Sequence, residues 1–192
     1  MSEDNQFFSV ACRFNAYLQP WTQPLPDDDA LKSLQPSGVQ LISQAKAIEA
    51  SCMLQLRQLE HESKAIIDYL KIQSRKVDLV LQYILEQEID DSDCFQGSHF
   101  GGSGFTVINL SPLQPDSLYR TTLSIREELI AILCIAKVTH CQAIPDMPDH
   151  WQIKLDFERI LDEDVEQLVQ ASLRLQQKQL QLRRKQLKQS PN

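Results

Sequence analysis

The feature that most constrains this chain is a long segment that has the spacing of a helix and lacks the residues that end one. Residues 37–89 contain no proline, and their one glycine stands near the start. Apolar residues recur at alternating steps of three and four, which favours a coiled-coil-like helix over an ordinary surface helix. The positions of this seam are Ile42, Ala45, Glu49, Cys52, Leu56, Leu59, Ser63, Ile66, Leu70, Gln73, Val77, Val80, Ile84 and Gln87.

An unbroken helix over this segment is too long for its own domain. It would reach ~70 Å, about twice the width of a compact domain of this size. It must fold back as a hairpin or pack outside the domain, and no Pro or Gly between residues 39 and 96 marks a hairpin turn. We therefore predict one long helix that packs against another subunit. The residues expected at that contact are Leu56, Leu59, Ile66, Leu70, Val77, Val80 and Ile84.

Segments on both sides of this helix have the alternation of β-strands. Residues 7–18 and 151–158 place apolar side chains at every second position, which is the period of a strand with one face on a core. The stretch between 97 and 160 holds further β-rich runs separated by turn residues, which predicts a small antiparallel barrel. The side chains expected in its core include Phe8, Val10, Phe14, Trp151, Ile153, Leu155 and Phe157.

A C-terminal helix is predicted over residues 162–189. Its acidic residues come first and its basic residues last, as the helix dipole favours. Its leucines form two stripes about 140° apart, given 100° per residue. One stripe can cover the barrel, and the other needs a second partner. The stripes are Leu168, Leu175 and Leu182, and Leu173, Leu180 and Leu187.

These segments predict an α+β protein, a small antiparallel barrel with a long inserted helix and an extended C-terminal helix. Three prolines between residues 20 and 26 indicate a linker after the first strand. The expected division is a barrel domain formed by 1–26 and 90–192, with 27–89 as a helical, coiled-coil-like insertion.

Composition and charge limit the possible functions. A net charge of −7 argues against a general nucleic-acid binder. The longest apolar run, at 129–136, is too short to cross a bilayer, and the acidic N-terminus is unlike a signal peptide, so we expect a cytoplasmic protein without membrane insertion. Five cysteines without CxxC spacing indicate reduced thiols, and neither a metal site nor a cofactor is expected. No nucleophile motif accompanies the four histidines, so we expect no enzyme.

The stretch HFGGSGFTV, residues 99–107, contains three of the five glycines of the chain and leads into a strand. It lacks the lysine that ends a Walker loop and the third spaced glycine of a dinucleotide fingerprint, so it is read as a tight turn. The order of a first strand at FFSV, a glycine-containing turn, a meander, a last strand ending in FERI and a helix opening with DEDVEQL resembles the PilZ domain family.

The resemblance implies a ligand site that this chain has lost in part. Many PilZ domains bind cyclic di-GMP through an RxxxR pair before the first strand and a DxSxxG turn before a later one. Asn5 and Ser9 stand at the arginine positions here. His99 stands at the aspartate position and Gly101 at the serine position, while Gly104 matches. These five positions are therefore expected to be inactive.

The function expected from this resemblance is a divergent, non-enzymatic interaction module in bacterial signalling. It would self-associate through its heptad helices, as a tetramer by preference or as a dimer, and act on an unidentified protein partner. The alternative is a cyclic di-GMP receptor with a non-standard site.

Overall fold

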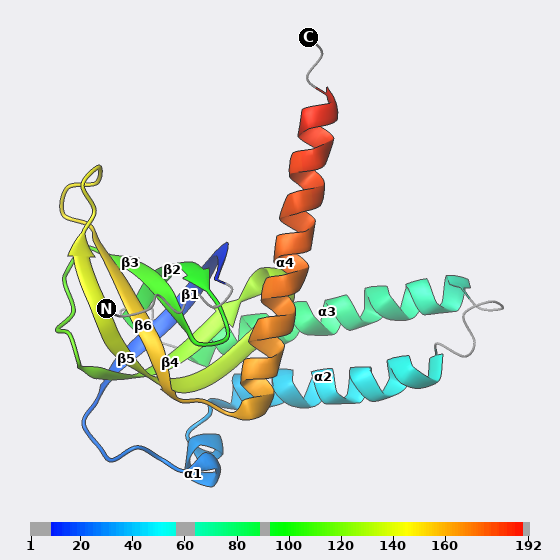
Figure 1. Cartoon of the computed structure of the whole chain (residues 1–192). Coiled ribbons are helices and arrows are strands. Elements are labelled where there is room, and N and C mark those ends of the chain that lie inside the picture. Colours follow the sequence, from blue (N-terminus) through cyan, green and yellow to red (C-terminus); the bar gives the residue numbers. More distant parts are fainter. Residues whose placement is uncertain (1–8, 57–63, 89–92, 190–192) are drawn as a thin grey trace.

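The structure, a computed structural model, describes residues 9–56, 64–88 and 93–189. Six strands form a closed barrel in the order β1-β2-β3-β6-β5-β4, and each strand is antiparallel to its neighbours (Figure 1). The strands are β1 (Val10–Trp21), β2 (Cys94–Phe100), β3 (Gly104–Asn109), β4 (Leu118–Ile125), β5 (Ile130–Ala143) and β6 (Trp151–Arg159). The helices are α1 (Asp28–Ser33), α2 (Ser37–Leu56), α3 (Lys64–Glu88), the 3-10 turn η3 (Arg126–Glu128) and α4 (Asp162–Gln189). The predicted α+β class and the small antiparallel barrel are confirmed.

The barrel core includes inward side chains that the alternation predicted. Ile153 and Leu155 of β6 are fully buried, and Trp151 and Phe157 pack against the core while staying partly exposed. In β1, Val10 is buried and pairs with Phe100 of β2. Phe8, which was also predicted for the core, lies outside the described residues. The other buried core members of β1 are Phe14, Ala16 and Leu18.

Two boundaries at the first strands differ from the sequence prediction. β1 continues through Pro20 to Trp21, where a linker was expected. Beyond Tyr17 this strand is paired on one side only, by β4, and such a position tolerates proline. The prediction also missed most of β2, because Gly97 weakens its strand signal. The ring of Phe14 lies where a Gly97 side chain would be, 2.3 Å from an ideal Cβ.

The segment after β1 packs onto the outside of the barrel. Asp27 caps α1 by accepting a hydrogen bond from the Ala30 N–H at 2.8 Å. The buried Leu31 of this short helix contacts Leu133 and Ile135 on the outer side of β5. This part of the predicted insertion is therefore joined to the barrel by an apolar cluster of its own.

The single long helix predicted over 37–89 is wrong. The structure has two helices, α2 and α3, which lie side by side as a hairpin (Figure 1). Folding back buries Ile67 and Leu85, and the base of the hairpin docks on β5 through the cluster of Val39, Ile42, Leu85 and Ala131. The seam spacing fits two packed helices as well as one, which is why it did not reveal the break. The division into two domains stays a prediction.

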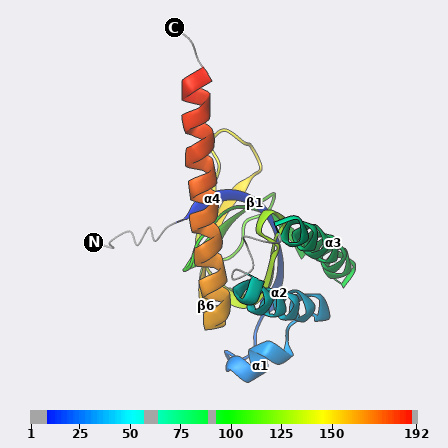
Figure 2. The same ribbon diagram turned by 90° about the vertical axis from the view of Figure 1, so that its right-hand side faces the viewer.

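The C-terminal helix α4 packs on the barrel with its first half and extends away from it with its second (Figures 1 and 2). Leu168 and Leu175 of the first predicted stripe are buried on the barrel side together with Ala171, whereas the third member, Leu182, is 52% exposed because α4 has left the barrel there. The Gln179 side chain also donates to the Ala11 carbonyl at 2.8 Å. Within the described part of the chain, no helix combines the length and apolar character needed to span a bilayer.

Candidate functional site

The turn between β2 and β3 stands where the resemblance places a ligand. The Gly101 N–H donates to the Gly104 carbonyl at 2.9 Å, which closes the turn. The pairing of Val10 with Phe100 brings the start of β1 beside this turn, and Ser9 directly precedes that pair. Of the two predicted positions at the start of the chain, the structure therefore places Ser9 near this turn.

The side chains at this turn do not supply the expected ligand chemistry. His99 is exposed at the end of β2, and its Nδ1 lies 3.2 Å from the hydroxyl of Ser98. Ser9 is exposed and carries no positive charge, and Asn5 lies outside the described residues. A bidentate arginine pair and an acidic acceptor are therefore absent from the described positions of the turn.

The glycines of the turn have a packing role. A Cβ at Gly102 would lie 2.7 Å from a methyl carbon of Val169 in α4, and a Cβ at Gly104 would lie 2.3 Å from the Leu155 carbonyl oxygen in β6. Both distances are shorter than van der Waals contact, so larger residues would push α4 or β6 away. The turn is small because α4 and β6 pack closely against it.

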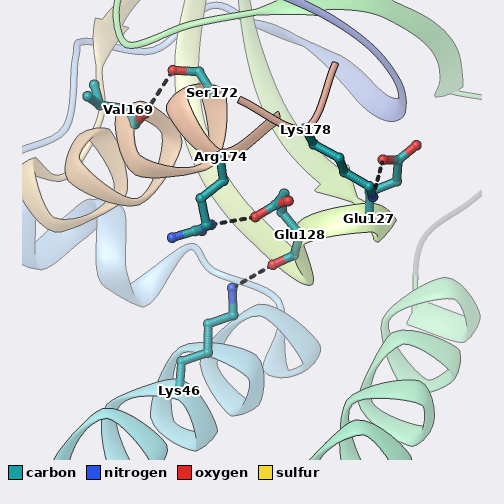
Figure 3. A network of polar contacts seen from close by, with 7 residues as sticks. All are labelled: Lys46, Glu127, Glu128, Val169, Ser172, Arg174 and Lys178. Carbon is teal, nitrogen blue, oxygen red and sulfur yellow. Dashed lines mark hydrogen bonds and ion pairs between the residues drawn. The ribbon is translucent and has the colours of Figure 1, made fainter. Parts of the chain in front are cut away.

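A second candidate site is a groove of about 870 Å³ where α2, the β4–β5 turn and α4 meet (Figure 3). Glu128 connects its three walls. The Lys46 ammonium donates to the Glu128 carbonyl at 3.2 Å, and the Arg174 Nε donates to the Glu128 carboxylate at 2.8 Å. Beside them, Lys178 and Glu127 form an ion pair at 3.8 Å. These contacts tie the hairpin to the barrel and the barrel to α4.

The electrostatics of this groove do not favour an anionic ligand. Burial, with a smaller effect of Arg174, lowers the pKa of Lys46 to about 8. Burial, with the mutual repulsion of Glu49 and Asp78, raises the pKa of Glu49, and burial also raises that of Asp78. Carboxylates outnumber bases along the groove, which disfavours a doubly charged dinucleotide. Among the described residues, no group of three or more His, Cys, Asp or Glu is placed to hold a metal ion.

The third candidate is the surface of the helical hairpin. Four of the predicted contact residues, Ile66, Leu70, Val77 and Val80, are exposed on α3, while Ile84 is partly buried. Leu56 is the last residue of α2, and Leu59 lies outside the described residues. We call the α3 set Ile66, Leu70, Val77, Val80 and Ile84 the first stripe.

A second apolar stripe on α3 was missed. Tyr69, Ile72, Leu79 and Tyr83 are all exposed, and Tyr83 reaches 62%. At 100° per residue they lie about 110° from the first stripe and face away from the buried Ile67 and Leu85. Their steps of three, seven and four were visible in the sequence, but only one seam was traced through the segment.

Sequence comparisons and comparisons of folds give different results. No protein-family model matches the chain, and no curated protein matches it. Solved structures do match. One is a tetrameric PilZ-domain protein from Xanthomonas campestris, described as self-assembled via an unusual helical bundle. It is 12% identical, with 92% of this chain and 91% of that one covered and a TM-score of 0.54.

Two further matches cover about half of this chain. The inhibitor of motility MotI/DgrA of Bacillus subtilis is 21% identical over 44% of this chain and 42% of its own, with a TM-score of 0.40. MrkH of K. pneumonia in its apo state is 19% identical over 48% and 43%, with a TM-score of 0.41. The chain has a divergent PilZ-like fold, which the full-length match supports.

Proposed function

We propose that this chain is a non-enzymatic, PilZ-like interaction module of bacterial signalling that self-associates through its helical hairpin. Its protein partner is unidentified, and its place of action is the cytoplasm. The observation that carries the proposal is the apolar surface of α3, which the described part of the chain leaves exposed. A tetramer is the favoured assembly, and a dimer is the alternative.

The uncovered surface has a large energetic cost in water. Val77 and Val80 are 53% and 58% exposed, and the second stripe is exposed to a similar extent. Full burial of one such side chain contributes about 1.5–3 kcal/mol. Two adjacent apolar stripes on one helix are unusual for a monomer, and a symmetric pairing of copies would cover them.

The similarity to the Xanthomonas campestris protein supports the same proposal. That protein is a tetramer assembled through a helical bundle, and the similarity extends over nearly the whole of both chains. Self-assembly of a PilZ domain through helices is therefore found in one solved protein of similar fold. For this chain the tetramer remains part of the proposal.

The state of the β2–β3 turn supports a role without the usual cyclic di-GMP site. Each charge-assisted hydrogen bond contributes about 1.5–3 kcal/mol. The loss of two arginines and one aspartate would cost about 5 kcal/mol or more, and each 1.4 kcal/mol is tenfold in affinity. The contact of Gly102 with Val169 also places α4 directly against the turn.

Charged substitutions on the first stripe test the assembly. Val77→Glu with Val80→Glu should dissociate the protein while the barrel stays folded, because two carboxylates would have to be buried in the contact. The matched control is Lys71→Glu, which adds negative charge to α3 at an exposed position away from both stripes. Light scattering measures the mass and near-ultraviolet circular dichroism the fold. Equal masses for the double variant and the unmodified protein would overturn the role of this stripe.

Calorimetric titration separates the proposal from the receptor alternative. The exposed Arg13 on β1 is the residue that favours that alternative. We expect no saturable heat when cyclic di-GMP is added at up to 100-fold excess over micromolar protein. Binding at micromolar affinity or tighter, lost in Arg13→Ala, would establish the receptor instead.

A further inference from the structure

The outward face of α4 carries an apolar stripe that is only partly covered: Val169 contacts Gly102 of the β2–β3 turn, and all three residues of the stripe keep a large exposed area. Val169, Leu173 and Leu180 are 40%, 44% and 54% exposed. At 100° per residue they lie about 100–160° around the helix from the buried Leu168 and Leu175. In Figure 2, α4 runs in front of the barrel, and no other element crosses its outward side. We call these three residues the outer stripe.

The charges beside the outer stripe change sign along the helix. The first turn is acidic, with Asp162 and Glu163 exposed, and Glu166 is exposed one turn later. The second half is basic, and the exposed Arg183, Arg184 and Lys185 are consecutive. One end of this surface is therefore negative and the other positive, with apolar residues between them.

We propose that the outer stripe binds the outer stripe of a second copy of this chain, with the two α4 helices antiparallel. Leu173 and Leu180 take the a positions of a heptad, and Val169 and Gln176 take the d positions. In the antiparallel register, Val169 faces Leu180 of the second copy, and Leu173 faces Gln176. The two copies of the stripe thereby contact each other across a twofold axis.

Charge decides the direction of this pairing. In the same register Glu166 faces Arg183 of the second copy, and the acidic first turn lies beside the basic half. A parallel pair would place Arg183 and Arg184 beside their own copies, and like charges at that distance repel. The buried face of α4 is turned about 100–160° away from the stripe, so the main contact of each barrel with α4 lies outside the pair.

The pairing adds a surface to the proposed self-association. The α4 pairing itself does not depend on the hairpin contact. Only the assembly of a tetramer rests on the proposed function, because it needs the hairpin contact as well. If the hairpin contact and the α4 contact both form, two different twofold contacts generate a tetramer, whereas either one alone gives a dimer.

One pair of matched variants tests the surface. Leu173→Glu with Leu180→Glu should halve the mass measured by light scattering. The control Leu182→Glu carries the same substitution at a leucine that is also half exposed, at 52%, but lies on the other face of α4. We expect the control to keep the mass of the unmodified protein. Equal masses for the two variants, or a loss of mass in both, would overturn the proposal.

Charge reversal tests the direction. Arg183→Glu with Arg184→Glu should weaken association at least tenfold, and so should Glu163→Lys with Glu166→Lys. All four changes together should restore the dissociation constant to within about threefold, since only an antiparallel pair exchanges the two charged ends. A four-residue variant weaker than either pair would overturn the antiparallel arrangement.

The hairpin variant Val77→Glu with Val80→Glu separates this inference from the proposed function. If the unmodified protein is a tetramer, and the hairpin variant and the α4 variant each halve its mass, both contacts exist. If only the α4 variants dissociate a dimer, the hairpin contact fails and the α4 pairing holds. If only the hairpin variants dissociate it, the α4 pairing is overturned. An unmodified protein with the mass of one chain would overturn both.

Discussion

Asp164, in the first turn of α4, is a carboxylate almost withdrawn from water. Its side chain is 2% exposed, and its Oδ2 has no hydrogen-bond partner among the described residues. Burial, with a smaller contribution from Glu163, raises its pKa from the ordinary 3.8 to about 7, against the opposing charge of Lys32. The folded protein therefore binds a proton here that the unfolded chain releases.

This carboxyl group makes stability depend on pH. A folded pKa above the unfolded one leaves stability intact below pH 3.8 and reduces it as the pH rises toward 7. The full cost above pH 7 is about 4 kcal/mol as an upper value. Asp164→Asn should therefore stabilise the protein at pH 8 much more than at pH 5. Urea denaturation at pH 5 and pH 8 measures the free energy of unfolding of the variant and of the unmodified protein. A gain in stability that is the same at both pH values would contradict the raised pKa of Asp164.

Single residues also explain what the sequence could not reveal about the turn. The pattern of glycines at 101–104 was correctly read as a tight turn, because the ligand residues were missing from it. The reason for those glycines lies in Val169 and Leu155, which are far away in the chain. Close approach between distant segments leaves no local pattern, so the sequence alone could not supply it.

Among the elements, the hairpin of α2 and α3 depends on a close helix contact at its base. A Cβ at Gly38 would lie 2.9 Å from the Cα of Leu85, and backbone cannot move aside as a flexible side chain can. Gly38→Val should therefore separate the two helices and cost about 1–3 kcal/mol, as overpacking does.

Hydrogen exchange measures this effect element by element. In the Gly38→Val variant, amides of α2 and α3 should lose protection while those of β4 and β5 keep it. Gln40→Val, at an exposed position of the same helix, is the control for the change in helix propensity. Unchanged protection of α2 in the Gly38 variant would show that the helices are not held at this point.

The elements differ in how well their sequences predicted them. The strand β6 and the helix α4 follow clean periods of two and of about 3.6, and both were found with their correct faces. The hairpin was missed because apolar residues at steps of three and four fit two arrangements equally well. These are two helices packed together within one chain and one long helix packed against a second chain. The sequence between α2 and α3 contains no Pro or Gly, so the choice between these two arrangements depends on tertiary packing rather than on local propensity.

At the scale of the whole molecule, the barrel is closed and covered by its own chain, whereas the helices are not. α1 seals one part of its outer surface through Leu31, and α4 covers another through Leu168 and Leu175. The hairpin and the second half of α4 extend outward with apolar residues exposed (Figure 1). The sequence predicted that apolar stripes of the insertion and of the C-terminal helix would lack a partner, but it took the two helices of the insertion for one.

The most direct test is the mass of the unmodified protein, measured by light scattering with size exclusion from about 1 to 100 μM. Self-association through the helices predicts four times the 22.0 kDa of one chain, with twice that mass if a single contact forms. A mass of 22.0 kDa at every concentration would contradict the account, because the apolar stripes would then be exposed in the functional protein.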